Sequence, residues 1–486
     1  MDYCPHTPSD IAQMQATVGA GSLDDLFADI PQKFRLKQIP GMPAALSESE
    51  TLGLMQAISG KNRLPRMTLT GAGAYAHFIP AVVGHMVGRA EFYTAYTPYQ
   101  AEISQGILQA IYEYQTMIAH LTGTEIANAS MYDGASATAE AAVLCVKMSN
   151  RSGIVVARSV HPQYRQVLKT YAWANGYTLT EIPYAPSGQM DLTVLAKALD
   201  KSVAAVVLQS PNFFGCIEDL TTVAEAAHQN GALLIAGFTD GTSLGVLKPA
   251  GESGADFVTG EGQSFGNPLG YGGPYLGIFA AREKYLRRIP GRLAGATVDK
   301  NGKRGFVLTL QTREQHIRRE KATSNICSNE ALCALAAGVY LAALGKNLKR
   351  LAELNIYKTQ YLKINFCNLP TGKKSFPLRL ITNLLCAAPM PIPSMKNCRR
   401  KASSAATNCQ RTIRNLTTRC SFAQRRCFPK AIWTGWWRLL NSDCHDTRND
   451  KKVGEHQWNL FLKSAGPDEA LRMLRQAMCR PSISIV

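Results

Sequence analysis

Short apolar runs alternate with amphipathic segments through the middle of the chain. The apolar runs have the length of strands and are rich in β-branched and small residues: GIVVAR (153–158), AAVVLQ (204–209), GALLIAGF (231–238) and ADFVTG (255–260). Helical patterns lie between them, at 162–176, 191–200 and 223–230. This alternation predicts a mostly parallel β-sheet that is covered by helices on both faces.

The first 60 residues have a different pattern, with short helical stretches. Ser22 precedes Asp25 by three residues, and Ser47 precedes Glu50 by three residues. Both are capping-box patterns, in which side chains satisfy the unpaired N–H groups of a helix start. We therefore expect a packed N-terminal arm of short helices over 1–60, separated by Pro31, Pro40 and Pro43.

No apolar run is long enough to cross a membrane. The longest candidate, 331–345, has 15 residues between Glu330 and Lys346, which predicts a buried core helix. The first residues, MDYCPHTPSD, have neither a basic start nor an apolar stretch, so we expect no secretory signal. The five cysteines of 1–364 are widely spaced, which fits free thiols in a reducing cytoplasm.

Charge divides the chain unevenly. The 486 residues carry a formal net charge of +18, yet 1–364 holds 32 basic and 29 acidic residues. The segment 365–486 holds 21 basic and 6 acidic residues, and no acidic residue occurs from 354 to 442. The same segment contains 8 of the 13 cysteines and 4 of the 5 tryptophans. The basicity therefore belongs to the tail and not to the rest of the chain.

Three interpretations of the tail 365–486 compete. A basic arm with interleaved tryptophans is typical of nucleic-acid binding. A cysteine cluster suggests a metal site, but no CxxC or HxxxH spacing occurs, which argues against zinc. The third is a stretch translated out of frame, which we favour because 371–426 lacks a regular apolar face. We accordingly expect no metal and no nucleic-acid partner.

Ligands of open parallel sheets bind beyond the carboxyl ends of the strands, so the loops there are candidate sites. In MYDGASATAEAA (131–142), Asp133, Gly134, Ser136 and Thr138 precede an Ala-rich helix. The N-terminus of a helix offers free N–H groups and suits a phosphate. An ordinary capped helix is the alternative, because the motif is neither a Walker loop nor GxGxxG.

Tyrosines gather in the loop TAYTPYQAEISQG (94–106) and just before it. Tyr93, Tyr96, Tyr99 and Glu102 lie around a proline, so they are suited to orient a small polar substrate. The alternative is a packed connection. A second loop, GEGQSFGNPLGYGGPYLG (260–277), has seven glycines and two prolines, which indicates positive φ angles, close backbone approach or a purely structural loop.

A charged segment and two single residues complete the candidates. In 312–332, the residues Arg313, His316, Arg318 and Lys321 are suited to hold an anionic ligand or a partner, or form a solvated helix face. Two further residues follow predicted strands. Asp240 is placed to face a cationic ring nitrogen or to cap a turn, and His161 to stack on a flat ligand or to pack as a structural histidine.

Six segments together resemble one known family, the glycine cleavage system P-protein, over about 1–364. The segments are GAGAYAHFIPAVV (71–83), TAYTPYQAEISQG (94–106), ASMYDGASATAEA (129–141), QSPNFFGCIED (209–219), GEGQSFGNPLGYGGPYLG (260–277) and TREQHIRREKATSNIC (312–327). The chain is most similar to the α-type chain (subunit 1) of the two-subunit bacterial form. The resemblance ends near residue 369.

The resemblance implies an α/β fold of type I among pyridoxal-phosphate enzymes, the aspartate aminotransferase fold. It implies an arm at 1–60, a large domain at 61–310, the helical start of a smaller domain at 311–364 and an aberrant tail at 365–486. In the family a lysine binds the cofactor as a Schiff base before a Gly-rich loop. The corresponding place here is near Gln263 and Ser264, where no lysine occurs.

The missing lysine implies that no catalytic residue lies on this chain alone. The family's α chain pairs with a β subunit that carries pyridoxal phosphate, in an expected α2β2 heterotetramer. Together they decarboxylate glycine and pass its aminomethyl group to the lipoyl arm of H-protein. Tyr93 to Glu102 is the first choice for a shared site, followed by Asp133–Thr138 and Arg313–Lys321. Two alternatives are an autonomous aminotransferase or decarboxylase that uses Lys248, and a nucleic-acid-binding protein that acts through the tail.

Overall fold

The computed structural model describes residues 6–36, 41, 43–62, 73–93, 95–322, 324–326 and 329–367. The interpretations of the tail 365–486 therefore lie outside the described residues, apart from its first three positions. The chain forms two compact units, Met1–Leu64 and Pro65–Val486. Each unit is considered by itself.

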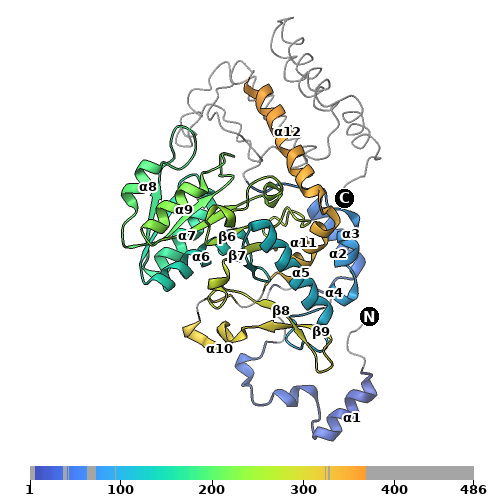
Figure 1. The fold of residues 1–486 in the computed structure, drawn as a ribbon. Coiled ribbons are helices and arrows are strands. Elements are labelled where there is room, and N and C mark those ends of the chain that lie inside the picture. Colours follow the sequence, from blue (N-terminus) through green and yellow to red (C-terminus); the bar gives the residue numbers. More distant parts are fainter. Residues whose placement is uncertain are drawn as a thin grey trace, which may run out of the picture. The chain divides into compact units, whose positions relative to one another are not determined.

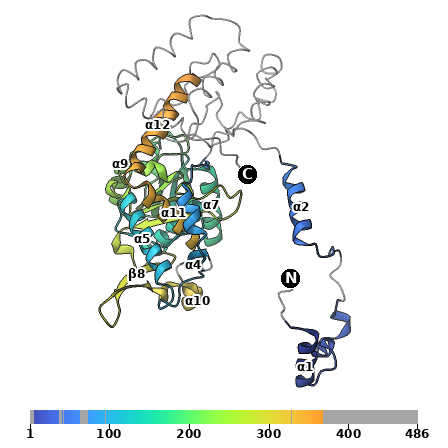
Figure 2. The same cartoon turned by 90° about the vertical axis from the view of Figure 1, so that its right-hand side faces the viewer.

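The first unit consists of short helices: α1 (Pro8–Val18), η1 (Leu23–Phe27), η2 (Gln32–Phe34) and α2 (Glu48–Ser59). Figure 2 shows α1 and α2 as separate helices. Both predicted capping boxes are confirmed, since Ser22 and Asp25, and Ser47 and Glu50, exchange side-chain and backbone hydrogen bonds. No described residue of this unit is buried, so its helices do not build a core of their own.

The second unit contains a seven-stranded sheet with the order β1-β7-β6-β5-β4-β2-β3. Its strands are β1 (Ile126–Ala127), β2 (Gly153–Ala157), β3 (Thr178–Ile182), β4 (Val203–Gln209), β5 (Leu233–Phe238), β6 (Phe257–Glu261) and β7 (Gly277–Ala281). Strands β3, β2, β4, β5 and β6 are parallel to one another. Strand β7 is antiparallel to β6, and β1 is antiparallel to β7. The predicted mostly parallel sheet and its four predicted strands are confirmed.

Helices cover this sheet, and α6 to α9 gather at the left of Figure 1. The helices before and between the strands are α3 (Ala81–Val87), α4 (Ala90–Tyr93), α5 (Gln105–Thr122), α6 (Gly134–Ser149), α7 (Pro162–Asn175), α8 (Leu192–Ala198) and α9 (Leu220–Gln229). The predicted helices at 162–176, 191–200 and 223–230 correspond to α7, α8 and α9. Every residue of β2, β4, β6 and β7 is buried, as expected for strands covered on both faces.

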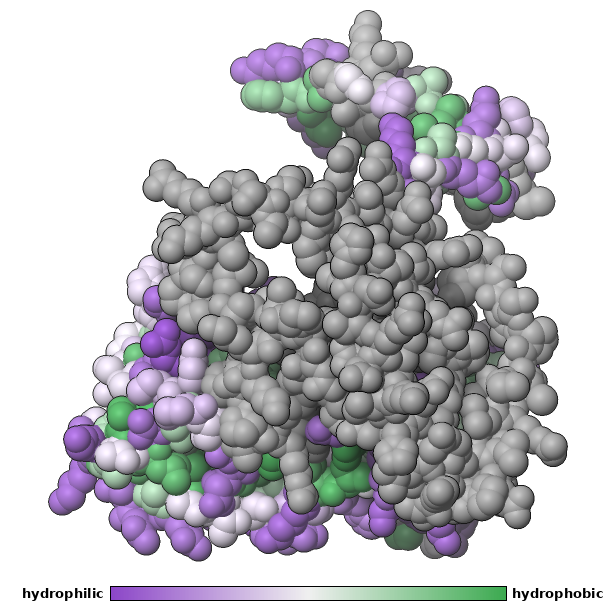
Figure 3. Space-filling model, turned by 90° about the horizontal axis from the view of Figure 1, so that it is seen from above, coloured by the Kyte–Doolittle hydropathy of each residue, from purple (hydrophilic) through white to green (hydrophobic). Residues whose placement is uncertain are grey.

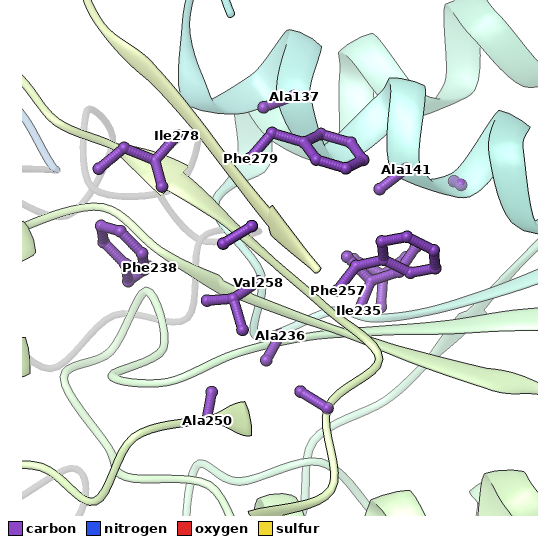
Figure 4. Close-up of a cluster of buried hydrophobic side chains, with 14 of the residues drawn as sticks. Ala137, Ala141, Ile235, Ala236, Phe238, Ala250, Phe257, Val258, Ile278 and Phe279 are labelled. Carbon is purple, nitrogen blue, oxygen red and sulfur yellow. The ribbon is translucent and has the colours of Figure 1, made fainter. Parts of the chain in front are cut away.

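The core between sheet and helices is apolar on both sides of the strands. Phe257 and Phe279 lie on the face toward Ala137 and Ala141 of α6, as Figure 4 shows. Alternation along the strands sends Val258 to the opposite face. This packing fixes the end of β6 against the start of α6, where the candidate site lies.

The chain continues beyond the sheet with a hairpin and helices. These are β8 (Leu293–Val298), β9 (Arg304–Thr309), α10 (Gln315–Arg318), α11 (Ala331–Leu344) and α12 (Asn347–Cys367). Short 3-10 helices connect the elements: η3 (Gly241–Gly245), η4 (Gly251–Ser253), η5 (Glu283–Tyr285), η6 (Gln311–Arg313) and η7 (Arg319–Lys321). The predicted core helix is confirmed as α11, in which Ala334, Ala337 and Tyr340 are buried.

Hydropathy characterises both the helices and the surface of the described part of the chain. None of its helices is individually long and apolar enough to span a membrane; α11 and α12 meet that test only jointly, with a 91° bend between them. On the face drawn in Figure 3, hydrophilic side chains alternate with apolar ones over the visible described surface.

Candidate functional site

The carboxyl ends of β2, β5 and β6 bring several predicted residues together. The N–H of Gly241, directly after Asp240, donates to Oγ of Ser264 at 3.0 Å. The N–H of His161 donates to the side chain of Gln209 at the end of β4, at 2.8 Å. The loops after these strands therefore meet at one edge of the sheet, as their positions in the sequence predict.

Asp240 is buried and caps η3. Its Oδ1 accepts hydrogen bonds from the N–H of Thr242 at 2.9 Å and from its hydroxyl at 2.7 Å. Its Oδ2 lies 3.9 Å from Nε2 of His77. The capping role that the sequence left open is therefore present, and a histidine of the chain stands next to the other carboxyl oxygen.

His161 is also buried, and it caps α7 through Nδ1, which accepts from the N–H of Gln163 at 3.1 Å. Its ring meets Phe213 edge-on, with centroids 5.1 Å apart. Gly73 has a φ of 97°, and a Cβ built there would lie only 3.1 Å from the His161 ring. The backbone at Gly73 thus packs directly on the histidine that was predicted to stack on a flat ligand.

The start of α6 is held by carboxyl groups of the chain itself. Asp133 caps the helix, because its Oδ1 accepts from the N–H of Ser136 at 2.8 Å. The N–H of Gly134 donates to Oε2 of Glu261 at 3.1 Å. The hydroxyl of Thr138 bonds to the carbonyl of Gly134 and to Thr259, each at 2.8 Å. Two of the N–H groups that suit a phosphate therefore already have acceptors.

Glu261 is a residue that the sequence reasoning missed. Its carboxyl group also accepts from the N–H groups of Gln263 and Leu276, both at 3.1 Å. Burial is the largest influence on this group and raises its pKa to about 8, against the three hydrogen bonds, which lower it. An acidic residue at the end of the buried strand FVTGE was the available signal.

The residues at this edge do not fit a covalently held pyridoxal phosphate. The only lysines between 231 and 290 are Lys248 and Lys284, so none lies beside Gln263 or Ser264 in the sequence. The amide of Gln263 donates to the carbonyl of Asn267. Lys248, the residue of the alternative enzyme hypothesis, is exposed, unlike the buried Asp240 and His161. The described residues also contain no group of side chains that could hold a metal ion.

A second cluster joins the tyrosine loop to the charged segment. The Tyr99 hydroxyl accepts from Nη2 of Arg292 at 2.7 Å, and the rings of Tyr99 and His316 meet edge-on at 6.2 Å. Oε2 of Glu314 lies 3.7 Å from Nε of Arg292 and 3.4 Å from Nδ1 of His316. Arg292 and Glu314 are buried. Glu314 belongs to the charged segment 312–332, whereas Arg292 was not predicted, because it lies far from the tyrosine loop in the sequence.

The other predicted residues divide into exposed and structural ones. Five are exposed: Tyr93, Tyr96, Glu102, Arg318 and Lys321. Arg313 instead donates to the backbone carbonyls of Ile289, Gly291 and Leu310, so it holds the loops together. Burial lowers the pKa of its guanidinium.

A comparison with known families shows to which family a chain with this sheet edge and this tyrosine cluster belongs. The sequence model of the glycine cleavage system P-protein matches residues 1–421. The chain belongs to the glycine cleavage system P-protein family. This match runs past residue 369, near which the sequence motifs predict that the resemblance ends. The alignments with two curated relatives cover 379 and 373 residues.

Relatives of this P-protein family member carry one shared name. The chain is 54% identical to "Probable glycine dehydrogenase (decarboxylating) subunit 1" of Desulfitobacterium hafniense, over 77% of this chain and 84% of the relative. The protein of the same name from Desulforamulus reducens is 53% identical, over 76% and 83%.

Solved structures confirm the type I fold of pyridoxal-phosphate enzymes for this P-protein family member. A crystal structure of glycine decarboxylase (P-protein) of the glycine cleavage system, in inhibitor-bound form, is 46% identical, with a TM-score of 0.74 over 78% of this chain and 86% of that one. A sphingosine-1-phosphate lyase of Burkholderia pseudomallei shares the fold at 15% identity, with a TM-score of 0.55 over 88% and 97%.

Proposed function

We propose that this chain is the α-type subunit of a decarboxylating glycine dehydrogenase, the P-protein of the glycine cleavage system, and acts with a β subunit. The observation that carries this proposal is the 54% identity to a protein named subunit 1, over 84% of that relative's length. The absence of a lysine at Gln263 and Ser264 supports it, because an α-type chain depends on its partner for the reaction.

The cofactor in this proposal, pyridoxal phosphate, belongs to the β subunit. Glycine loses CO2 at that subunit's site, and the aminomethyl group passes to the lipoyl arm of H-protein in glycine catabolism. In this chain no lysine occurs in the sequence at Gln263 and Ser264, and the N–H of Gly134 already donates to Glu261 and not to a cofactor phosphate. We further propose an α2β2 assembly in a reducing cytoplasm, which suits Cys145, Cys216 and Cys333, because these described cysteines form no disulfide.

The chain's contribution to the shared site is a surface that we call the tyrosine face: Tyr93, Tyr96, Tyr99, Glu102 and His316. The side chain of Tyr96 is 80% exposed, and Tyr93 and Tyr99 are exposed as well. Exposed aromatic side chains are enriched where proteins meet partners. Beneath them, Arg292 holds the Tyr99 hydroxyl, which supports a fixed orientation of this ring.

Secondary candidates for the shared site are Asp133–Thr138 and Arg313–Lys321. Of these, Arg318 and Lys321 are exposed and free to face an anionic group of a partner. Arg313 and Asp133 have structural hydrogen bonds, so we assign them the lower rank.

Cofactor binding by the purified chain tests this proposal against an autonomous enzyme. Titration of the isolated chain with pyridoxal phosphate should give no protein-bound cofactor that survives borohydride reduction as a labelled lysine. Stoichiometric labelling that disappears in K248A would instead establish the autonomous alternative.

A further inference from the structure

Three backbone N–H groups from separate parts of the chain converge on one buried side chain, Glu261. They belong to Gly134 at the start of α6, Gln263 after β6 and Leu276 before β7, and each donates at 3.1 Å. The Glu261 residue is only 8% exposed. We call these three N–H groups the N–H cradle.

The N–H cradle has the geometry of an oxyanion site. Backbone N–H groups that point at one position, together with the positive end of a helix, are the arrangement by which proteins bind phosphates and carboxylates. The three hydrogen bonds that Glu261 accepts from the described residues all come from backbone N–H groups. The cradle therefore accepts a carboxyl group, and the chain supplies one itself.

The neighbouring places for a ring-shaped ligand are also filled from within the chain. The backbone at Gly73 packs on the ring of His161, and His77 lies next to Asp240. The Phe265 ring is so close to Gly241 that a Cβ there would meet it at 2.4 Å. These contacts occur at the same edge of the sheet as the N–H cradle.

We propose that the Glu261 carboxyl group is an internal substitute for a bound oxyanion, which fills the N–H cradle and keeps this edge closed to phosphate-bearing ligands. Removal of the Glu261 carboxyl group converts the N–H cradle into a site for a free small oxyanion such as formate or inorganic phosphate. This inference concerns the chain's own edge and does not rest on the proposed activity.

Anion rescue of the full-length chain tests the proposal. In chloride, E261A should unfold at a lower temperature than the unsubstituted chain, because three buried N–H groups lose their acceptor. Sodium formate or phosphate at equal ionic strength should raise the E261A midpoint with the logarithm of anion concentration, as for one bound ligand. The unsubstituted chain should show no such rise.

Two further variants keep the test decisive. E261Q fills the cradle with an isosteric amide and should not respond to either anion. E218A removes another buried carboxyl group, which accepts hydrogen bonds from the side chains of Ser159 and Asn212 and from one backbone N–H, that of Met190, and should lose stability without anion rescue. If E261A yields folded protein only in formate and not in chloride, the proposal stands. Equal recovery in both salts, or a response of E261A no larger than that of E218A, would overturn it.

Discussion

At the scale of single residues, Glu261 combines burial with three hydrogen bonds from the backbone. Burial outweighs those bonds, so its pKa rises from 4.5 to about 8. When the pKa of an acid is higher in the folded state than in the unfolded state, its contribution to stability is fully present at pH values below the unfolded-state pKa. This contribution is lost as the pH rises through the folded-state pKa. The relevant window is therefore about pH 4.5 to 8.

The pH dependence of unfolding checks this assignment. Between pH 5 and 8.5 the unfolding free energy of the unsubstituted chain should fall relative to that of E261Q, by up to a few kcal/mol at about 1.4 kcal/mol per pKa unit. Urea titrations at both pH values measure the difference, and E261Q removes only this group's titration. Parallel pH curves for the two proteins would show that Glu261 does not titrate in this range.

One residue of the tyrosine face and one control residue elsewhere have nearly the same exposed fraction, which allows a matched comparison. Tyr96 is 80% exposed in the proposed tyrosine face, and Trp173 is 81% exposed on α7. Y96A should weaken binding to the β subunit or glycine turnover by about tenfold, the effect of losing an aromatic interface residue. W173A should leave both unchanged. Equal effects of the two substitutions would remove the support for the tyrosine face.

At the scale of elements, the start of α6 is packed more tightly than that of α5. A Cβ at Gly134 would meet the Tyr164 hydroxyl at 2.1 Å and the Gly260 backbone at 2.7 Å, whereas Gly106 in α5 has open space. G134A should therefore destabilise the chain by more than about 3 kcal/mol through overpacking. G106A should be neutral or stabilising by up to about 1 kcal/mol, because alanine favours helices. Thermal unfolding of both variants measures this contrast, which the packing account requires.

The strands differ in how well the sequence alone predicts them. Apolar runs bounded by turn residues are sufficient for β2, β4, β5 and β6, because burial on both faces leaves a continuous local pattern. Strand β3 has mostly exposed or half-buried residues, so it leaves no such run. The short antiparallel β1 is stabilised by pairing with β7, which lies far along the chain.

The candidate site was predictable in part for the same reason. Motifs placed Asp133, His161 and Asp240 at one edge of the sheet, because loops after parallel strands share that edge. The contacts that decide their roles are long-range. Glu261 reaches Gly134 over 127 positions, and Arg292 reaches Tyr99 over 193. No local pattern encodes such pairs, so both unpredicted residues emerged only from the fold.

At the scale of the whole molecule, the net charge of +18 belongs mainly to 365–486, whereas 1–364 is close to neutral. The family match covers 1–421, and the described helices and strands end at residue 367. The properties that define the proposed subunit therefore lie in a body of nearly balanced charge. Its closed sheet edge and its exposed tyrosine face together suggest a chain that completes a partner's site.

The most direct test of this account is glycine decarboxylation by the full-length chain with and without a candidate β subunit. Release of CO2 from carboxyl-labelled glycine, in the presence of pyridoxal phosphate and lipoylated H-protein, should require both chains. The chain alone should release no label above background. Turnover by the isolated chain at the rate of the mixture would contradict the account, because this chain would then hold a complete active site of its own.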